Sequence, residues 1–361
     1  MFFLAKQVRL VEGSDQRFDQ YDLLKGIYIV FVILSHSFTN FISEASRLPG
    51  HSKVLTALRL IVFAVSYGAN AMLMIVCGLQ FRKKSMRTIV QSQVKHLWKP
   101  FLYTVLATFI AVVITTWVTG GNILAETARK VLPLALGNVD NTPYFGIPMV
   151  DGCGPMWFII VFVVSGIMLN AVLQIKDVSL QWITVILLYF TGKITGIWTN
   201  IPEYLPFGIY RGMRYTLYMY IGYQIKKTAF FDKRFPVWLL IFAAFFAVHF
   251  VLLEQNNDVS CLVIAFGSMV VASRLDGIKL RLFKGLRRLG RMIMPFCCIH
   301  TVFYKTFTWE FMQHYFANNS ALCAMVLLVI YTVTGIGGCM LLDNIKRRRI
   351  MKRHPKAIGG N

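Results

Sequence analysis

The stretch "DLLKGIYIVFVILSHS", residues 22–37, begins with the charged side chains Asp22 and Lys25 and continues as an apolar run that contains His36 near its end. A helix of roughly 20 mostly apolar residues crosses about 30 Å of hydrocarbon. With its flanks the stretch is long enough for such a crossing. It therefore predicts a membrane-spanning helix over 22–41, and this helix decides the fold class.

The same pattern recurs along the whole chain. Its 361 residues are 56% hydrophobic and only 15% charged, with a mean hydropathy of +0.58, whereas a soluble chain carries about a quarter charged residues. The fold class is thus predicted as all-α, a polytopic integral membrane protein of about ten transmembrane helices. The predicted crossings lie near 22–41, 56–80, 97–118, 154–173, 179–199, 206–225, 236–253, 258–274, 291–311 and 321–342.

The basic residues indicate the orientation. The chain has 38 Lys and Arg against 16 Asp and Glu, and the predicted outer loops contain only Arg47, Lys53, Arg129 and Lys130. Because Lys and Arg accumulate on the cytoplasmic side of membrane proteins, both termini are predicted to be cytoplasmic. The charges are expected to contact anionic membrane lipids, and no nucleic-acid partner is expected. We predict one membrane domain over 1–345 and a basic tail over 346–361.

Lys25 and His36 are eleven residues apart, which is about 3.06 helical turns, so they lie on one helix face with Asp22 one turn below. His36 lies roughly 16 Å deeper than Lys25, past the bilayer centre. An ionisable side chain at that depth normally faces the bundle interior or a wet cavity. Two interpretations stay open, a histidine held by an interhelical hydrogen bond and a functional histidine. Lys25 alone is typical of a snorkelling interfacial residue.

A second histidine is predicted at a similar depth. His300 lies roughly 14 Å along a helix that begins at Arg291. A hydrogen-bonded core histidine and a functional one are equally compatible with this position. A zinc site needs at least three protein ligands, and no cluster of His, Asp or Glu in the sequence supplies them, so no metal is predicted.

The extended segment "RFDQYDLLKGIYIVFVILSHS" resembles the first helix of the acyltransferase-3 family of bacterial integral-membrane O-acyltransferases. The family pattern is an acidic residue, then Arg, ten residues and His. Lys25 takes the arginine position, as in the fucose-O-acetylase-like branch. Four later stretches resemble family segments in the same order: "GANAMLMIVCGLQFRKKS" (68–85), "KHLWKPFLY" (95–103), "GPMWFIIVFVVSG" (154–166) and "LGRMIMPFCCIHTVF" (289–303).

The resemblance implies an enzyme that transfers an acyl group, commonly acetyl, to a hydroxyl of a cell-surface glycan or lipid-linked sugar. Its donor is a cytoplasmic acyl-CoA, which is a co-substrate, and no bound cofactor is expected. The implied location is the bacterial cytoplasmic (inner) membrane, where other envelope-glycan assembly proteins are candidate partners. His36 is the candidate general base, because a neutral imidazole accepts protons near neutral pH.

The other candidate site residues follow from charge and position. Lys25 contacts the CoA end of the channel or pairs with Asp22, and His300 orients the substrate or stabilises the oxyanion. Basic side chains suited to the CoA phosphates are Arg82, Lys84, Arg87, Lys95, His96 and Lys99. Lys95 and Lys99, four residues apart, share one helix face, but the Arg-x-x-Arg that larger family members place before the proline is absent. An ordinary basic loop on the inner side stays an open alternative. Candidate acceptor-binding residues are Trp157, Lys193, Arg211 and Arg214.

A transporter or exporter of a glycan or small polar solute is the alternative. Intramembrane Lys, Arg and His residues also line translocation paths, and the Gly- and Pro-interrupted region near 192–208 is similar to the broken helices of carriers. Carriers commonly contain repeated halves, and no internal repeat is visible here. The acyltransferase interpretation is therefore preferred.

Overall fold

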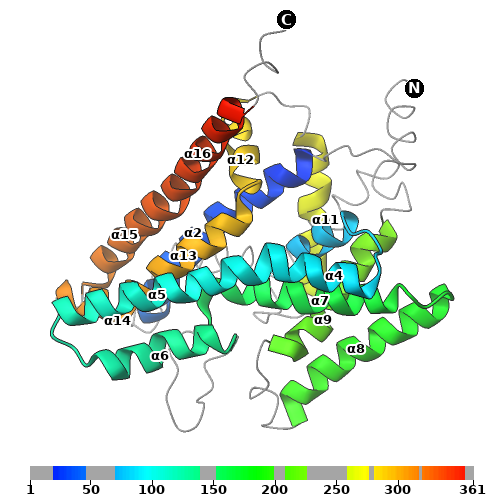
Figure 1. Ribbon diagram of the computed structural model, residues 1–361, viewed down its shortest axis with the longest axis horizontal. Helices are drawn as coiled ribbons and strands as arrows, with labels where there is room; N and C mark the ends of the chain where they lie inside the picture. Colours follow the sequence, from blue (N-terminus) through cyan, green and yellow to red (C-terminus); the bar gives the residue numbers. More distant parts are fainter. Residues whose placement is uncertain are drawn as a thin grey trace, which may run out of the picture.

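The computed structural model describes residues 19–45, 70–138, 152–198, 208–225, 258–275, 280–316 and 319–353. Throughout this part every regular element is helical, in agreement with the all-α prediction (Figure 1). The α-helices are α2 (Asp19–Ala45), α4 (Met86–Gln93), α5 (Lys99–Val118), α6 (Ile123–Ala135), α7 (Trp157–Val172), α8 (Val178–Trp198), α9 (Ile209–Ile225), α11 (Asp258–Leu275), α12 (Arg281–Gly290), α13 (Ile293–Thr306), α14 (Trp309–Tyr315), α15 (Ser320–Tyr331) and α16 (Gly338–Arg353).

Among the described residues, four helical segments are long and apolar enough to cross a membrane, namely Tyr21–Ile42, Met86–Val118, Gly154–Val172 and Ser320–Ile345. Shorter apolar helices are Asn70–Leu79, Val178–Ile194 and Cys261–Val271. These segments support a membrane protein. The predicted crossing 236–253 and both chain ends lie outside the described residues, so the count of about ten helices, the cytoplasmic termini and the domain boundary at 345 stay predictions.

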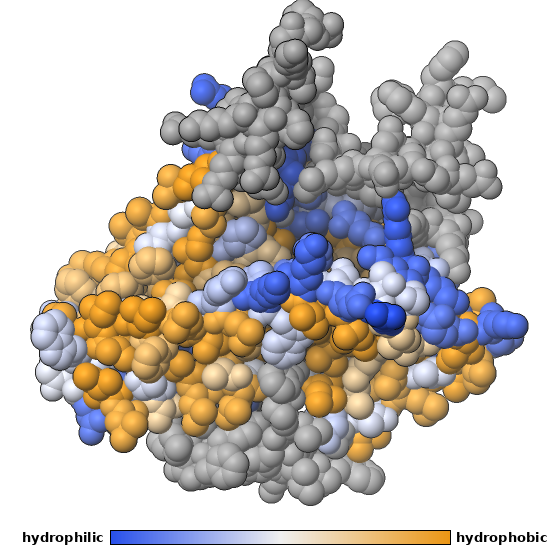
Figure 2. All heavy atoms as spheres, in the orientation of Figure 1, coloured by the Kyte–Doolittle hydropathy of each residue, from blue (hydrophilic) through white to orange (hydrophobic). Residues whose placement is uncertain are grey.

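The surface of α5 is typical of a helix in lipid. Its large exposed side chains are apolar and include Leu102, Leu106, Phe109, Ile110, Ile114 and Trp117. Its five buried residues include three threonines, Thr104, Thr108 and Thr116, beside Phe101 and Val112. The Thr108 hydroxyl donates to the carbonyl of Thr104 at 2.8 Å, so a polar group is satisfied within its own helix. Apolar residues outside and small polar residues at the helix interface are the membrane pattern, and Figure 2 shows the hydrophobic surface over α5.

The helical segment that contains α5 begins at Met86, before the predicted start at 97, and it is not α-helical throughout. Ser85 caps the first turn of α4 by accepting a hydrogen bond from the Thr88 backbone N–H at 3.2 Å. The chain then continues through the π-helical segment Val94–Trp98 into α5. Pro100 stands just after this segment, and a proline inside a helix lacks an N–H and clashes with the carbonyl of the preceding turn. A π-turn relieves that clash and alters the expected spacing of Lys95 and Lys99.

Helix α2 packs backbone against backbone with α12. A Cβ at Gly26 would collide with the carbonyl oxygen of Leu286, and a Cβ at Gly290 would collide with the carbonyl oxygen of Asp22. Small residues at such crossings let two helix backbones approach closely. The chain turns at Arg291 and Met292 and continues as α13, so this contact places the start of α13 beside the N-terminal end of α2.

The predicted crossing 291–311 is interrupted. Helix α13 ends at Thr306, and α14 begins at Trp309. Thr308 caps the new helix, because its side-chain oxygen accepts a hydrogen bond from the Phe311 backbone N–H at 3.3 Å. The continuous apolar pattern concealed this break.

Candidate active site

Helices α2 and α13 bring the two predicted histidines together. The ring centroids of His36 and His300 are 5.3 Å apart. The ring of Tyr304, one turn after His300 on α13, lies 4.6 Å from His36 with an interplanar angle of 61°. Two ionisable side chains from distant parts of the sequence therefore meet in the helical bundle.

Further rings enclose His300. Phe296 stacks on it at 5.0 Å with an interplanar angle of 15°, and Tyr331 of α15 approaches edge-on at 4.9 Å and 88°. The Tyr331 hydroxyl donates to the carbonyl of Phe307 at 2.9 Å. We call His36, Phe296, His300, Tyr304 and Tyr331 the ring cluster.

Three members of the ring cluster, which are Phe296, Tyr304 and Tyr331, were not identified from the sequence. Phe296, His300 and Tyr304 follow one another at intervals of four residues, and on a helix such residues share a face. That spacing was a usable signal for Phe296 and Tyr304. Tyr331 had none, because it comes from another helix.

His300 is buried, and no group among the described residues hydrogen-bonds its ring nitrogens. Its exposed fraction is 0%, and within the described part of the chain neither Nδ1 nor Nε2 has a hydrogen-bond partner. An unsatisfied buried polar group costs about 1–3 kcal/mol, so the structure maintains a destabilising feature here. His36 is partly buried. The pair thus combines two different imidazoles. That of His300 is enclosed and can hydrogen-bond a ligand, and that of His36 is more accessible than that of His300.

One end of the ring cluster is covered by the short helical turn Gly154–Met156 and the residues before it. The buried Lys305 donates from Nζ to the carbonyl of Gly152 at 2.6 Å. Gly154 has a positive φ of 55°, and a Cβ there would lie 3.0 Å from Cδ1 of Tyr304. Glycine is therefore required where this segment packs on the Tyr304 ring.

The opposite end of α2 carries an ion cluster. The Asp22 carboxylate is 1% exposed and lies 3.4 Å from Nζ of Lys25 and 3.9 Å from Nη1 of Arg291. Lys25 and His36 belong to the same uninterrupted helix, so about 16 Å of helix separate the ion cluster from the ring cluster.

Comparison with known proteins identifies the chain. Residues 18–343 match the family model Acyl_transf_3, described as an acyltransferase domain. The match includes both histidines and the ion cluster. The chain belongs to the acyltransferase-3 family. Searches of curated proteins and of solved structures found no match. Family membership supports the acyltransferase role and does not favour the transporter alternative.

In this acyltransferase-3 protein the candidate donor-binding residues all lie at the surface; they are Arg82, Lys84, Arg87, Lys95, His96 and Lys99. Asn170 of α7 holds the loop that carries the first of them, because its Oδ1 accepts from the Lys84 N–H at 2.9 Å and its Nδ2 donates to the Lys84 carbonyl at 3.0 Å. Figure 2 shows the hydrophilic surface over α4. The loop around Lys84 is thus held in place by Asn170 and presents a basic surface.

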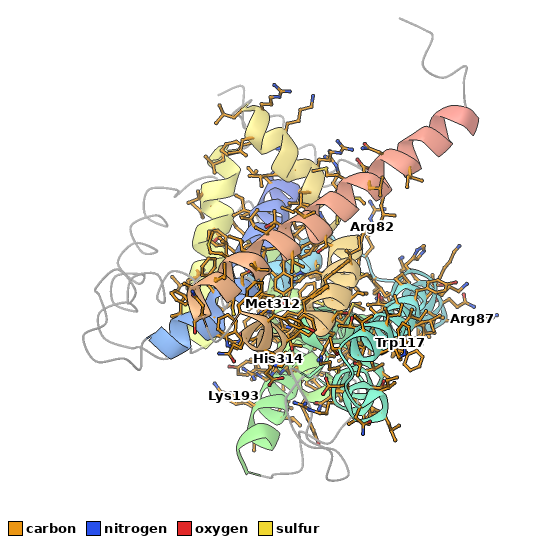
Figure 3. All side chains as sticks on the ribbon, turned by 90° about the vertical axis from the view of Figure 1, so that its left-hand side faces the viewer. Arg82, Arg87, Trp117, Lys193, Met312 and His314 are labelled. Carbon is orange, nitrogen blue, oxygen red and sulfur yellow. The ribbon has the colours of Figure 1, made fainter. Side chains whose placement is uncertain are left out.

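The candidate acceptor-binding residues gather where α7 and α9 begin and α8 ends. Cζ of Arg211 lies 5.6 Å from the centroid of the Trp157 ring, and Nζ of Lys193 lies 5.8 Å from that of Tyr189. A Cβ at Gly192 would lie 3.0 Å from Cγ of Arg214, so α8 and α9 meet closely there. Figure 3 shows Lys193 well away from Arg82 and Arg87.

Proposed function

We propose that the protein transfers an acyl group, acetyl in the first instance, from cytoplasmic acyl-CoA to a hydroxyl of a cell-surface glycan or lipid-linked sugar. The observation that carries this proposal is the 5.3 Å approach of the His36 and His300 rings inside an acyltransferase-3 domain. Two imidazoles at this separation suit the two tasks of acyl transfer, which are proton removal and stabilisation of an oxyanion.

The partly buried His36 acts as the general base. Its neutral imidazole takes the proton from the acceptor hydroxyl while the hydroxyl oxygen attacks the thioester carbonyl carbon. His300 donates a hydrogen bond to the carbonyl oxygen, which gains negative charge. The new C–O bond then replaces the C–S bond. The CoA thiolate leaves and takes up the proton from His36, so the base is regenerated.

The donor approaches along α2 from its Lys25 end. The CoA phosphates need cationic partners, and Lys binds phosphate as a point charge. Lys25 and Arg291 lie at this end around Asp22. From there to His36 the helix rises roughly 16 Å, a span that suits the extended pantetheine arm between the CoA phosphates and the thioester. The basic surface of Lys95 and Lys99 supplies further cations.

The donor site is tested by removing two cations together. The double variant Lys95→Gln/Lys99→Gln is expected to weaken acetyl-CoA binding several-fold without loss of folded protein, since both side chains are exposed. Binding is measured on purified protein by calorimetry. The matched control is Arg281→Gln/Lys284→Gln, which removes the same charge from exposed positions of α12. Equal binding by both double variants and wild type would place the phosphates elsewhere.

The function itself is tested in cells. Deleting the gene is expected to remove an ester-linked acyl group from an envelope glycan, seen as a mass shift of the isolated glycan. Wild-type protein restores the group. A glycan that disappears while its precursor accumulates would instead indicate an exporter.

A further inference from the structure

The two unbonded nitrogens of His300 constrain where the donor lies. In the described part of the chain no protein group bonds them, although the side chain is fully buried. A ligand atom that accepts a hydrogen bond from the His300 N–H would satisfy one of these nitrogens. In acyl transfer the thioester carbonyl oxygen is the acceptor whose charge grows along the reaction, and it is the atom that benefits most from a fixed donor.

The acyl tail must then lie among the rings. The carbonyl carbon is one bond from that oxygen, so the next carbon of the tail is placed beside the neighbours of His300. These neighbours are Phe296, stacked at 5.0 Å, and Tyr331, edge-on at 4.9 Å, and both are 1% exposed. Tyr331 is also fixed by its hydrogen bond to the Phe307 carbonyl.

The Phe296 ring is confined on one side by the backbone of a neighbouring helical segment. It packs against the π-helical segment Thr332–Gly337 that joins α15 to α16. A Cβ at Gly335 would approach Cε2 of Phe296 to 2.9 Å, which is closer than carbon atoms normally pack. The Phe296 ring is thus held between this segment and His300 and has little freedom to retreat. Residues enclosed in this way resist added volume.

We propose that Phe296 and Tyr331 determine the length of the transferred acyl group, so that acetyl is accepted and longer chains are rejected. This inference rests on the proposed acyl transfer at His36. One additional methylene in a fitted apolar pocket changes selectivity by about 10–200-fold. Butyryl carries two more methylenes than acetyl and is expected to be strongly disfavoured.

The experiment compares acetyl-CoA with butyryl-CoA as ligands of the purified full-length protein. Wild type is expected to bind acetyl-CoA at least about 10-fold more tightly than butyryl-CoA, and Phe296→Ala is expected to abolish or invert this preference. Because both ligands share the CoA moiety, a general loss of affinity cancels in the ratio. The control is Phe303→Ala, a ring of the same helix that stacks on Phe307 outside the ring cluster.

The outcomes separate this inference from the function on which it rests. If Phe296→Ala fails to fold, Phe296→Leu replaces the phenyl ring with a smaller aliphatic side chain and should shift the ratio in the same direction. A wild type that binds acetyl-CoA without a chain preference, or a folded Phe296 variant with the wild-type ratio, overturns the length determinant alone. A wild type that binds neither ligand overturns the proposed acyl transfer as well.

Discussion

The variant His36→Gln is expected to lose acyl transfer by at least about 100-fold, the lower limit for a lost general base. Glutamine can replace a hydrogen bond of the imidazole, but its amide cannot accept the hydroxyl proton. The protein should remain folded and inserted in the membrane, since His36 is only partly buried. The measurement is transfer activity per amount of folded protein, with acetyl-CoA binding determined separately.

Two further variants make this result specific. His36→Ala should be as inactive as His36→Gln and should express normally. His314→Gln makes the same substitution at an exposed histidine of α14, labelled in Figure 3, and should retain wild-type activity. A structural His36 predicts the reverse pattern, in which Gln is nearly normal and Ala is poorly expressed. Near-normal transfer by His36→Gln would exclude the role of His36 as base.

Replacing His300 by Leu is expected to change activity and stability in opposite directions. Loss of one oxyanion donor reduces turnover by about 10²–10³-fold. Stability should stay the same or rise, because an apolar group of similar size replaces a buried polar group whose two nitrogens have no partner within the described residues. Turnover and the thermal midpoint, both on purified protein, test the two expectations.

His300→Gln distinguishes a donor from a base. Its amide N–H can still donate to the oxyanion, so this variant should retain more turnover than His300→Leu. The contrast with His36, where Gln gives no rescue, separates the two histidines by role. Full activity of His300→Leu would show that His300 has no part in the reaction.

The sequence was sufficient for the helical membrane fold over the described residues. Apolar runs of about 20 residues have few alternatives in lipid, where backbone groups must bond within their own helix. It did not predict the π-segment before Pro100 or the break between α13 and α14. The first depends on a single proline within a long helix, and the second depends on the capping residue Thr308. A hydropathy pattern does not reveal either effect.

For the site, helical geometry alone placed Lys25 and His36 on one face and put His300 at a similar depth. The sequence also carried the family resemblance that the domain match later confirmed. Only the tertiary structure decided that His36 faces His300, that Tyr331 of α15 joins them, and that both nitrogens of His300 lack a partner among the described residues. The physical reason is that depth in a membrane depends on position along one helix, whereas contact depends on which helices are neighbours. That choice is made by close packing such as Gly26 against Leu286.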